Sequence, residues 1–208
     1  MGYSFAGPGF QGIDYSVGGA KTKYKLPSAE VYNAGVDQAY STLDTNQNKS
    51  GATVGVSYGL ASRNFVTTFG IDYINATPSM STTFKGTSTS TTGPITQVLQ
   101  NRYELYIAPG YKITPSTLAY LKLGVVDIPT KPQIDTSSVA TLTGGPSSYG
   151  AVVGLGMKQK FSYSSPYFLK FEYTGGQTKK AQTLDSTGNQ YQSKLMYQSA
   201  SASIGVNF

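Results

Sequence analysis

The residues of this sequence that could do chemistry are charged side chains on one face of a set of alternating segments. Four are acidic and four are basic, and they share that face with Gly and Ser. They are Asp14, Asp72, Arg102, Glu104, Lys122, Lys158, Lys170 and Glu172. Because an unpaired buried charge is very costly, the equal numbers of the two signs predict mutual pairing where this face is enclosed. We predict that Glu104 pairs with Lys122 on the next segment, and that Lys170 and Glu172, which share one segment, each pair with other segments.

The residue types that many catalytic and metal sites need are missing. The chain has no His and no Cys, which removes disulfides, thiolate metal ligands and Ser-His or Cys-His nucleophiles. Residues 7–12 fit the G-x-G-x-x-G pattern, but no strand precedes them, no helix follows, and Pro8 lies inside. We therefore expect no cofactor and no metal. A net charge of +6 would suggest an anionic partner in a soluble protein, but the placement of the charges matters more here, and we expect no nucleic-acid partner.

Eight segments position these charges, each with an apolar residue at every second position, which is the period of a β-strand. The predicted strands span residues 10–19, 51–60, 65–76, 98–111, 117–127, 148–160, 166–174 and 194–208. Short connections alternate with long ones, the short at 61–64, 112–116 and 161–165 and the long at 20–50, 77–97, 128–147 and 175–193. Short turns at one end and long loops at the other are typical of a transmembrane barrel. The sequence therefore predicts an all-β fold, an eight-stranded antiparallel up-and-down transmembrane β-barrel.

The two faces of the predicted strands are inverted relative to a soluble barrel. The charges within strands lie with Gly and Ser, whereas the other face is apolar and ends in aromatic residues, which are typical of a membrane interface. Two aromatic girdles are predicted from Phe65, Tyr73, Tyr103, Tyr111, Tyr149, Phe161, Tyr167 and Tyr173. The alternative is a soluble barrel with solvent-facing charges, in which the sorting of the loops and both girdles would be coincidences.

Several stretches resemble the OmpA/OmpX/opacity-type family of small outer-membrane barrels. YELYIAPGYKITPSTLAYLKLG at 103–124 resembles the central hairpin, and GLGMK at 154–158 followed by YFLKFEY at 167–173 is similar to later strands. The end, ASIGVNF, resembles the assembly signal of such barrels, with Ile204, Val206 and Phe208 alternating. The resemblance implies the Gram-negative bacterial outer membrane, insertion by the barrel-assembly machinery, both termini in the periplasm, short periplasmic turns and long extracellular loops.

The chain departs from this family in one way, because it stops at the barrel. We expect residues 1–208 to form a single barrel domain with 1–9 as an N-terminal extension, a signal peptide that has been removed, and no added domain for wall anchoring. Lipid-A deacylases and outer-membrane proteases of this architecture use a His, and this chain has none, so no enzymatic activity is expected.

Two functions fit such a barrel. The first is a non-enzymatic surface protein that acts structurally and through exposed loops, in adhesion, recognition or self-association, with Tyr24, Tyr32, Tyr40 and Tyr191 suited to contact. The second is a narrow porin-like channel. An eight-stranded interior is only just wide enough for its own side chains, so we expect large inward groups to leave no continuous opening.

A basic stretch follows the first predicted strand. Lys21, Lys23 and Lys25 alternate, and if the strand keeps its parity past Gly18 and Gly19 they point outward at the level of lipopolysaccharide phosphates. The alternative is a solvated loop stem, because the Gly pair could shift the parity.

Overall fold

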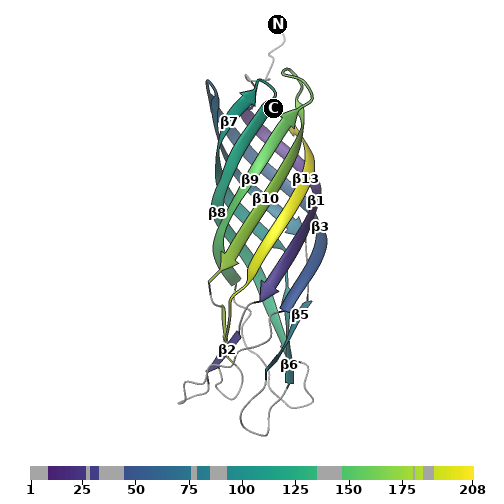
Figure 1. Cartoon of the computed structure of the whole chain (residues 1–208), viewed down its shortest axis with the longest axis vertical. Helices are drawn as coiled ribbons and strands as arrows, with labels where there is room; N and C mark the ends of the chain where they lie inside the picture. Colours follow the sequence, from purple (N-terminus) through teal and green to yellow (C-terminus); the bar gives the residue numbers. More distant parts are fainter. Residues whose placement is uncertain are drawn as a thin grey trace.

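The alternating segments pair into a closed barrel (Figure 1) in the computed structural model, which describes residues 9–26, 29–32, 45–75, 79–84, 93–134, 147–179, 181–184 and 190–208. The barrel strands are β1 (Gly12–Leu26), β3 (Thr45–Ser62), β4 (Phe65–Asn75), β7 (Arg102–Thr114), β8 (Thr117–Ile134), β9 (Ser147–Lys160), β10 (Tyr167–Thr178) and β13 (Met196–Asn207). Each pairs antiparallel with its neighbours along the chain, and the pairing of β1 with β13 closes the ring. The predicted eight-stranded up-and-down barrel is therefore confirmed.

The two ends of the barrel differ, as the connection lengths predict. Short turns join β3 to β4, β7 to β8 and β9 to β10, and the start of β1 and the C-terminus lie at this turn end (Figure 1). At the opposite loop end, a hairpin of β5 (Ser79–Phe84) and β6 (Gly93–Leu99) extends β8. A separate sheet is formed there by β2 (Ala29–Tyr32), β11 (Ala181–Leu184) and β12 (Gln190–Ser193). No helix long and apolar enough to cross a membrane occurs in the described residues.

Several predicted strand boundaries are wrong, by the largest margin on the loop side, and at the turn end β7 runs on to Thr114. β1, β3 and β8 run further into the predicted long loops, and the start of the strand predicted at 98–111 is divided, because 93–99 forms β6 and β7 begins at Arg102. The ladder continues through backbone hydrogen bonds, which need no apolar alternation in the side chains. At the break between β6 and β7, the Gln100 amide donates to the Pro129 carbonyl at 2.8 Å.

The barrel carries its apolar residues outside and its charged residues inside. Leu155 on the outer wall is 67% exposed, whereas Arg102, Glu104 and Lys122 in the lumen are each 1% exposed. The outward residues include Ile13, Val17, Val54, Val56, Leu60, Phe69, Ile71, Leu105, Leu121, Leu123, Val125 and Ile204. This distribution is favourable when hydrocarbon surrounds the barrel. The closed ladder satisfies the backbone hydrogen-bonding groups, and only the outer side chains contact lipid.

Candidate functional site

The lumen is filled in three layers along the barrel axis. Along β8 alone, the apolar Leu118 comes first, the cation Lys122 follows, and the apolar Val126 comes last. At the turn end, Phe10 packs with Val66 and Leu118. The loop-end apolar cluster comprises Ala20, Tyr24, Ile74, Leu99, Val126, Ile128, Val152, Leu195 and Tyr197. The central charged group around Lys122 therefore lies between an apolar cluster at the loop end and Phe10, Val66 and Leu118 at the turn end.

Lys122 is the centre of the charged layer. Its Nζ lies 2.5 Å from Asp72 Oδ2, 2.8 Å from Glu104 Oε2 and 3.6 Å from Glu172 Oε2. The structure thus places Glu104 next to Lys122, and adds two carboxylates to the same ammonium group. Arg102 Nε lies 3.1 Å from the other oxygen of Glu104, so this carboxylate bridges two cations.

Lys170 completes the central group. Its Nζ lies 3.5 Å from Asp72 Oδ1 on another strand and 3.5 Å from Glu172 Oε2 on its own strand. Lys170 thus pairs across to Asp72 and Glu172 pairs across to Lys122, as expected, and the two also pair with each other on β10. Residues two apart on a strand point to the same side, and in a narrow lumen both side chains converge on the same central space.

Lys158 and Asp14 form a second group nearer the turn end, where the Lys158 ammonium donates to Asp14 Oδ2. Asn207 Nδ2 donates to Asp14 Oδ1 at 2.9 Å, and Ser57 Oγ donates to Asp14 Oδ2 at 3.3 Å. Lys160 Nζ donates to Asn207 Oδ1 at 3.0 Å and to the Gly9 carbonyl. Lys160 was not among the predicted inward charges, although it has the same parity as Lys158 and extends the inward set by one position.

Aromatic rings fill the space between the charges. Lys122 lies 4.2 Å above the Tyr106 ring, Lys158 lies 4.1 Å above the Phe168 ring, and Arg102 lies 4.3 Å above the Tyr197 ring. Such cation–π contacts gain strength when water is excluded. Two phenol groups also donate to carboxylates, Tyr197 to Glu104 at 3.0 Å and Tyr120 to Glu172 at 2.9 Å.

Inward glycines accommodate these rings and leave little empty space. A Cβ at Gly70 would lie 2.5 Å from the Tyr106 ring, one at Gly156 2.2 Å from the Tyr120 ring, and one at Gly205 2.3 Å from the Phe168 ring. The voids that touch the charged layer measure only about 20 Å³ and 10 Å³. Since one water needs roughly 10–15 Å³, each holds a water or two and neither forms a path.

The predicted girdle residues lie on the outer wall at both ends of the strands. The rings of Phe65 and Tyr111 meet edge to face at 5.4 Å between centroids, and those of Tyr73 and Tyr103 lie 5.3 Å apart. The other predicted members, Tyr149, Phe161, Tyr167 and Tyr173, are exposed. One outward charge was not expected within a strand: Asp127 pairs in register with Tyr103 and Tyr149, because β8 continues past it.

The last strand carries the three residues of the predicted assembly signal. Ile204 and Phe208 are exposed on the outer wall and Val206 is half-buried, in the alternation of the strand. The backbone of Phe208 exchanges two hydrogen bonds with Ile13, at 2.9 Å and 3.0 Å, and its ring lies 6.2 Å from that of Tyr15.

The basic stretch belongs to β1 itself. The register runs unbroken through Gly18 and Gly19, so Lys21 and Lys23 are exposed on the outer wall and Lys25 is half-buried. The intervening Tyr24 is fully buried in the lumen, and its prediction as an exposed loop residue is wrong because the strand is longer than predicted. Tyr32 and Tyr191 lie on β2 and β12, and Tyr40 lies outside the described residues.

The described part of the chain contains no group of three or more His, Cys, Asp or Glu arranged to hold a metal ion. What the interior provides is a set of paired charges with aromatic cover. Such a set can stabilise one closed arrangement of the strands, and it presents neither an open nucleophile nor an open cavity for a substrate.

Comparisons with known proteins give similarity in three-dimensional structure. No protein-family model matches the chain, and the comparison with curated proteins finds no match. Among solved structures, the outer membrane protein OprG from Pseudomonas aeruginosa aligns with a TM-score of 0.61 at 15% identity, over 97% of this chain and 98% of that one. The attachment invasion locus protein Ail of Yersinia pestis was solved in complex with the heparin analogue sucrose octasulfate. It aligns with a TM-score of 0.52 at 13% sequence identity, over 95% of this chain and 99% of that one.

A third similar structure is an enzyme. The outer membrane protease OmpT from Escherichia coli aligns with a TM-score of 0.53 at 7% identity, over 95% of this chain and 97% of that one. At these identities the likeness shows the fold alone. The chain is therefore similar to outer-membrane β-barrels of several kinds, which share the architecture of the closed antiparallel barrel.

Proposed function

We propose that this chain is a non-enzymatic surface protein of the bacterial outer membrane that acts structurally and through its loop end, in adhesion, recognition or self-association. The observation that carries the proposal is the filled lumen. Paired charges, aromatic rings and apolar clusters leave the loop end as the region through which the barrel can contact partners, because the voids among the described luminal residues are too small for a passage or a substrate.

The location follows from the outer wall. A barrel with an apolar belt between aromatic girdles fits a hydrocarbon layer, and closed barrels of this type are built for the bacterial outer membrane. In this orientation the turn end faces the periplasm and the loop end faces outward. The partners we propose are outer-membrane lipid, lipopolysaccharide at Lys21, Lys23 and Lys25, the barrel-assembly machinery acting on Ile204, Val206 and Phe208, and an extracellular ligand or a second copy at the loops.

The comparisons support this class without fixing the partner. Ail is described as an attachment protein and was solved with a heparin analogue, so an eight-stranded barrel can serve in attachment. The protease OmpT shares the barrel shape, but this chain has no His, the residue on which enzymes of the resembling architecture depend. We therefore propose a role without catalysis.

Loop deletion tests the proposal directly. Four variants, each lacking one of the segments 33–44, 85–92, 135–146 or 185–189, should keep heat-modifiable migration on a gel, because the barrel strands are untouched. At least one should lose binding of whole bacteria to a host-cell layer, or self-association of the purified protein. A set of folded variants that all behave as wild type in both assays would leave only a structural role.

The alternative is a narrow channel, and the polar middle layer is the feature that favours it. A path would require Phe10 to leave the turn end and the cluster around Tyr24 and Tyr197 to open at the loop end. Planar-bilayer recording distinguishes the two functions. We expect no steady conductance from the wild type, and reproducible single-channel steps would make the channel the better proposal.

A further inference from the structure

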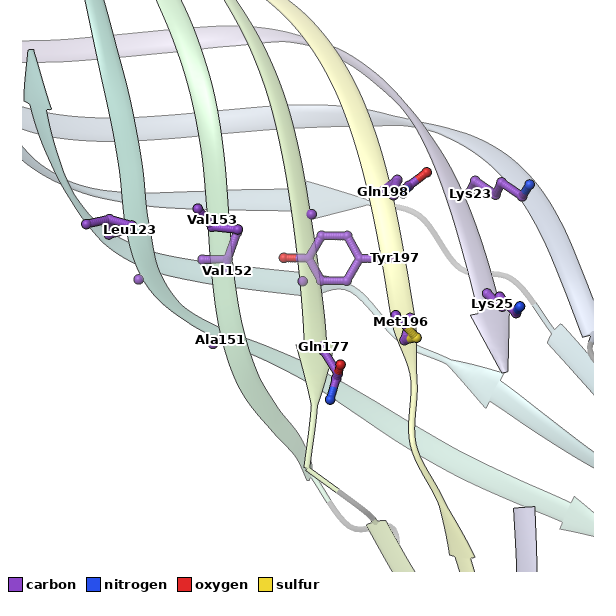
Figure 2. Close-up of a pocket in the computed structure, with 13 residues that line it drawn as sticks. Lys23, Lys25, Leu123, Ala151, Val152, Val153, Gln177, Met196, Tyr197 and Gln198 are labelled. Carbon is purple, nitrogen blue, oxygen red and sulfur yellow. The ribbon is translucent and has the colours of Figure 1, made fainter. Parts of the chain in front are cut away.

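A groove of about 730 Å³ lies on the outer wall of the barrel toward the loop end. It crosses β8, β9, β10, β13 and β1, and Figure 2 shows Leu123 and Val153 at one side of it and Lys23 and Lys25 at the other. Met196 adds a further apolar side chain, and Gln198 a polar one. Among the described residues that line the groove, none is acidic.

The groove runs obliquely from the apolar belt to the level beyond the girdle. One hydrogen-bonded row joins Leu123, Val153, Gly175, Gln198 and Lys23 across the five strands. Because the strands are tilted (Figure 1), a row at right angles to them comes closer to the loop end with each strand from β8 to β1. Leu123 lies on the turn side of the Tyr149 row, and Lys23 lies on the loop side of the Tyr173 row. One end is therefore at acyl-chain depth and the other at headgroup depth.

A bare glycine keeps the middle of the groove open. Gly175 follows Tyr173 on the outward face of β10, and a Cβ added to it would meet only the Tyr197 carbonyl oxygen, at 3.7 Å. That is an ordinary contact, so neither close packing nor an unusual backbone conformation requires glycine here. The neighbouring Gly176 differs, since its Cβ would lie 2.4 Å from the buried Tyr197 ring.

From this arrangement we infer that the groove holds one phosphorylated lipid of the outer leaflet. The phosphate lies at Lys23 and Lys25, and the neighbouring Gln177 and Gln198 donate to sugar or ester oxygens. An acyl chain extends over Gly175 against Val153 and Leu123. The inference deepens the proposed contact with lipopolysaccharide, and it rests on the proposed outer-membrane location. A second copy of the chain related by a two-fold axis fits less well, because it would bring its own lysines against the same cationic edge.

The test is lipid retention by the purified full-length protein in detergent micelles, measured by native mass spectrometry with titrated hexa-acylated, bisphosphorylated lipid A. The wild type should retain one lipid. Lys23→Gln should weaken retention about fivefold, the usual contribution of one Lys near an anionic headgroup. Gly175→Leu should weaken it roughly tenfold, since it displaces about two methylene groups from the groove.

Matched controls separate the groove from general effects. Gly19→Leu places the same side chain on another bare outward glycine, whose Cβ would meet only the Gly51 carbonyl at 3.9 Å, and Lys49→Gln removes an exposed cation outside the groove. Both should retain lipid as the wild type does. Dephosphorylated lipid A should bind wild type and Lys23→Gln alike. If Gly175→Leu loses heat-modifiable migration, Gly175→Ala is tested in its place. We then expect a smaller loss of lipid retention.

Three outcomes would overturn the inference. The first is equal lipid A retention by Gly175→Leu and Gly19→Leu, and the second is equal lipid A retention by Lys23→Gln and Lys49→Gln. The third is a dimer of the chain in the wild type that Gly175→Leu abolishes. None of these readouts depends on adhesion or conductance. A failure here therefore leaves the proposed surface function standing, and a failure of loop deletions to affect adhesion leaves the lipid site standing.

Discussion

The inner and outer surfaces of the barrel wall come from the same strands but differ in how their side chains are stabilised. On the inside, Lys122 is surrounded by Asp72, Glu104 and Glu172, and each group is satisfied by specific partners at specific distances. On the outside, apolar residues such as Leu155 face lipid and need only be apolar. The inner surface therefore requires one specific arrangement of side chains, whereas the outer surface requires only side chains that are favourable in lipid. Substitutions on the two surfaces should therefore fail for different reasons.

The largest effect is expected inside, at the shared cation. Lys122→Met keeps much of the side-chain volume but leaves three carboxylates facing one another, and should lower the free energy of unfolding by about 5 kcal/mol, the upper end for breaking a buried ion pair. Urea unfolding in lipid vesicles, followed by gel migration, measures the loss. Lys49→Met, at an exposed position, should leave the midpoint unchanged. A small loss at Lys122 would mean that the lumen is wet and its charges are screened.

A somewhat smaller loss is expected from one of the carboxylates. Glu104→Ala removes a partner of both Arg102 and Lys122, yet Lys122 keeps Asp72 and Glu172. The expected loss is about 4 kcal/mol if the layer is dry, and less if water reaches it. The same unfolding assay applies, with Glu104→Gln as the matched variant that keeps the acceptor for the Tyr197 hydroxyl. An equal loss of unfolding free energy in both variants would show that the charge of Glu104, rather than its hydrogen bonding, stabilises the barrel.

On the outer wall the expected effect depends on depth and not on partners. Leu155 lies on β9 midway between the girdle residues Tyr149 and Phe161. Leu155→Arg should cost about 3 kcal/mol in a bilayer, as for other barrels with a charge at the midplane. Refolding into vesicles at several urea concentrations gives the value. If the barrel stood in water, the same substitution would be neutral, so no effect would contradict the membrane orientation of this wall.

The smallest effect contrasts two glycines. Gly156→Ala should destabilise the barrel by about 2 kcal/mol, because the new Cβ overlaps the Tyr120 ring in the lumen. Gly175→Ala on the outer wall should cost less than about 0.5 kcal/mol, the usual scale for a surface change. Parallel thermal unfolding of both variants in detergent checks the order. Equal losses would show that the inner glycines do not hold space for the rings.

Much of this architecture could be predicted from the alternation of residue types. The period of two places Leu155 and Lys158 on opposite faces of one strand, and the same separation in the other strands gives the fold class and the inward set from the sequence. Only part of the pairing follows, because Glu104 and Lys122 lie on neighbouring strands whereas Lys122 reaches Asp72 only across the lumen of the closed ring. Tyr24 was misplaced because backbone pairing extends strands through polar residues, where side-chain alternation gives no signal.

The seating of Phe10 inside the turn end has a consequence for how the ring is completed. Phe10 is buried against Val66 and Leu118, while Asn207 on the last strand donates to the carbonyl of Gln11 and to Asp14 on the first. Asn207 therefore fastens the seam between β1 and β13 right beside Phe10, which fills the turn end. Because Gln11 and Asp14 flank the start of β1, a barrel whose seam is held by Asn207 also has Phe10 fixed in its turn end.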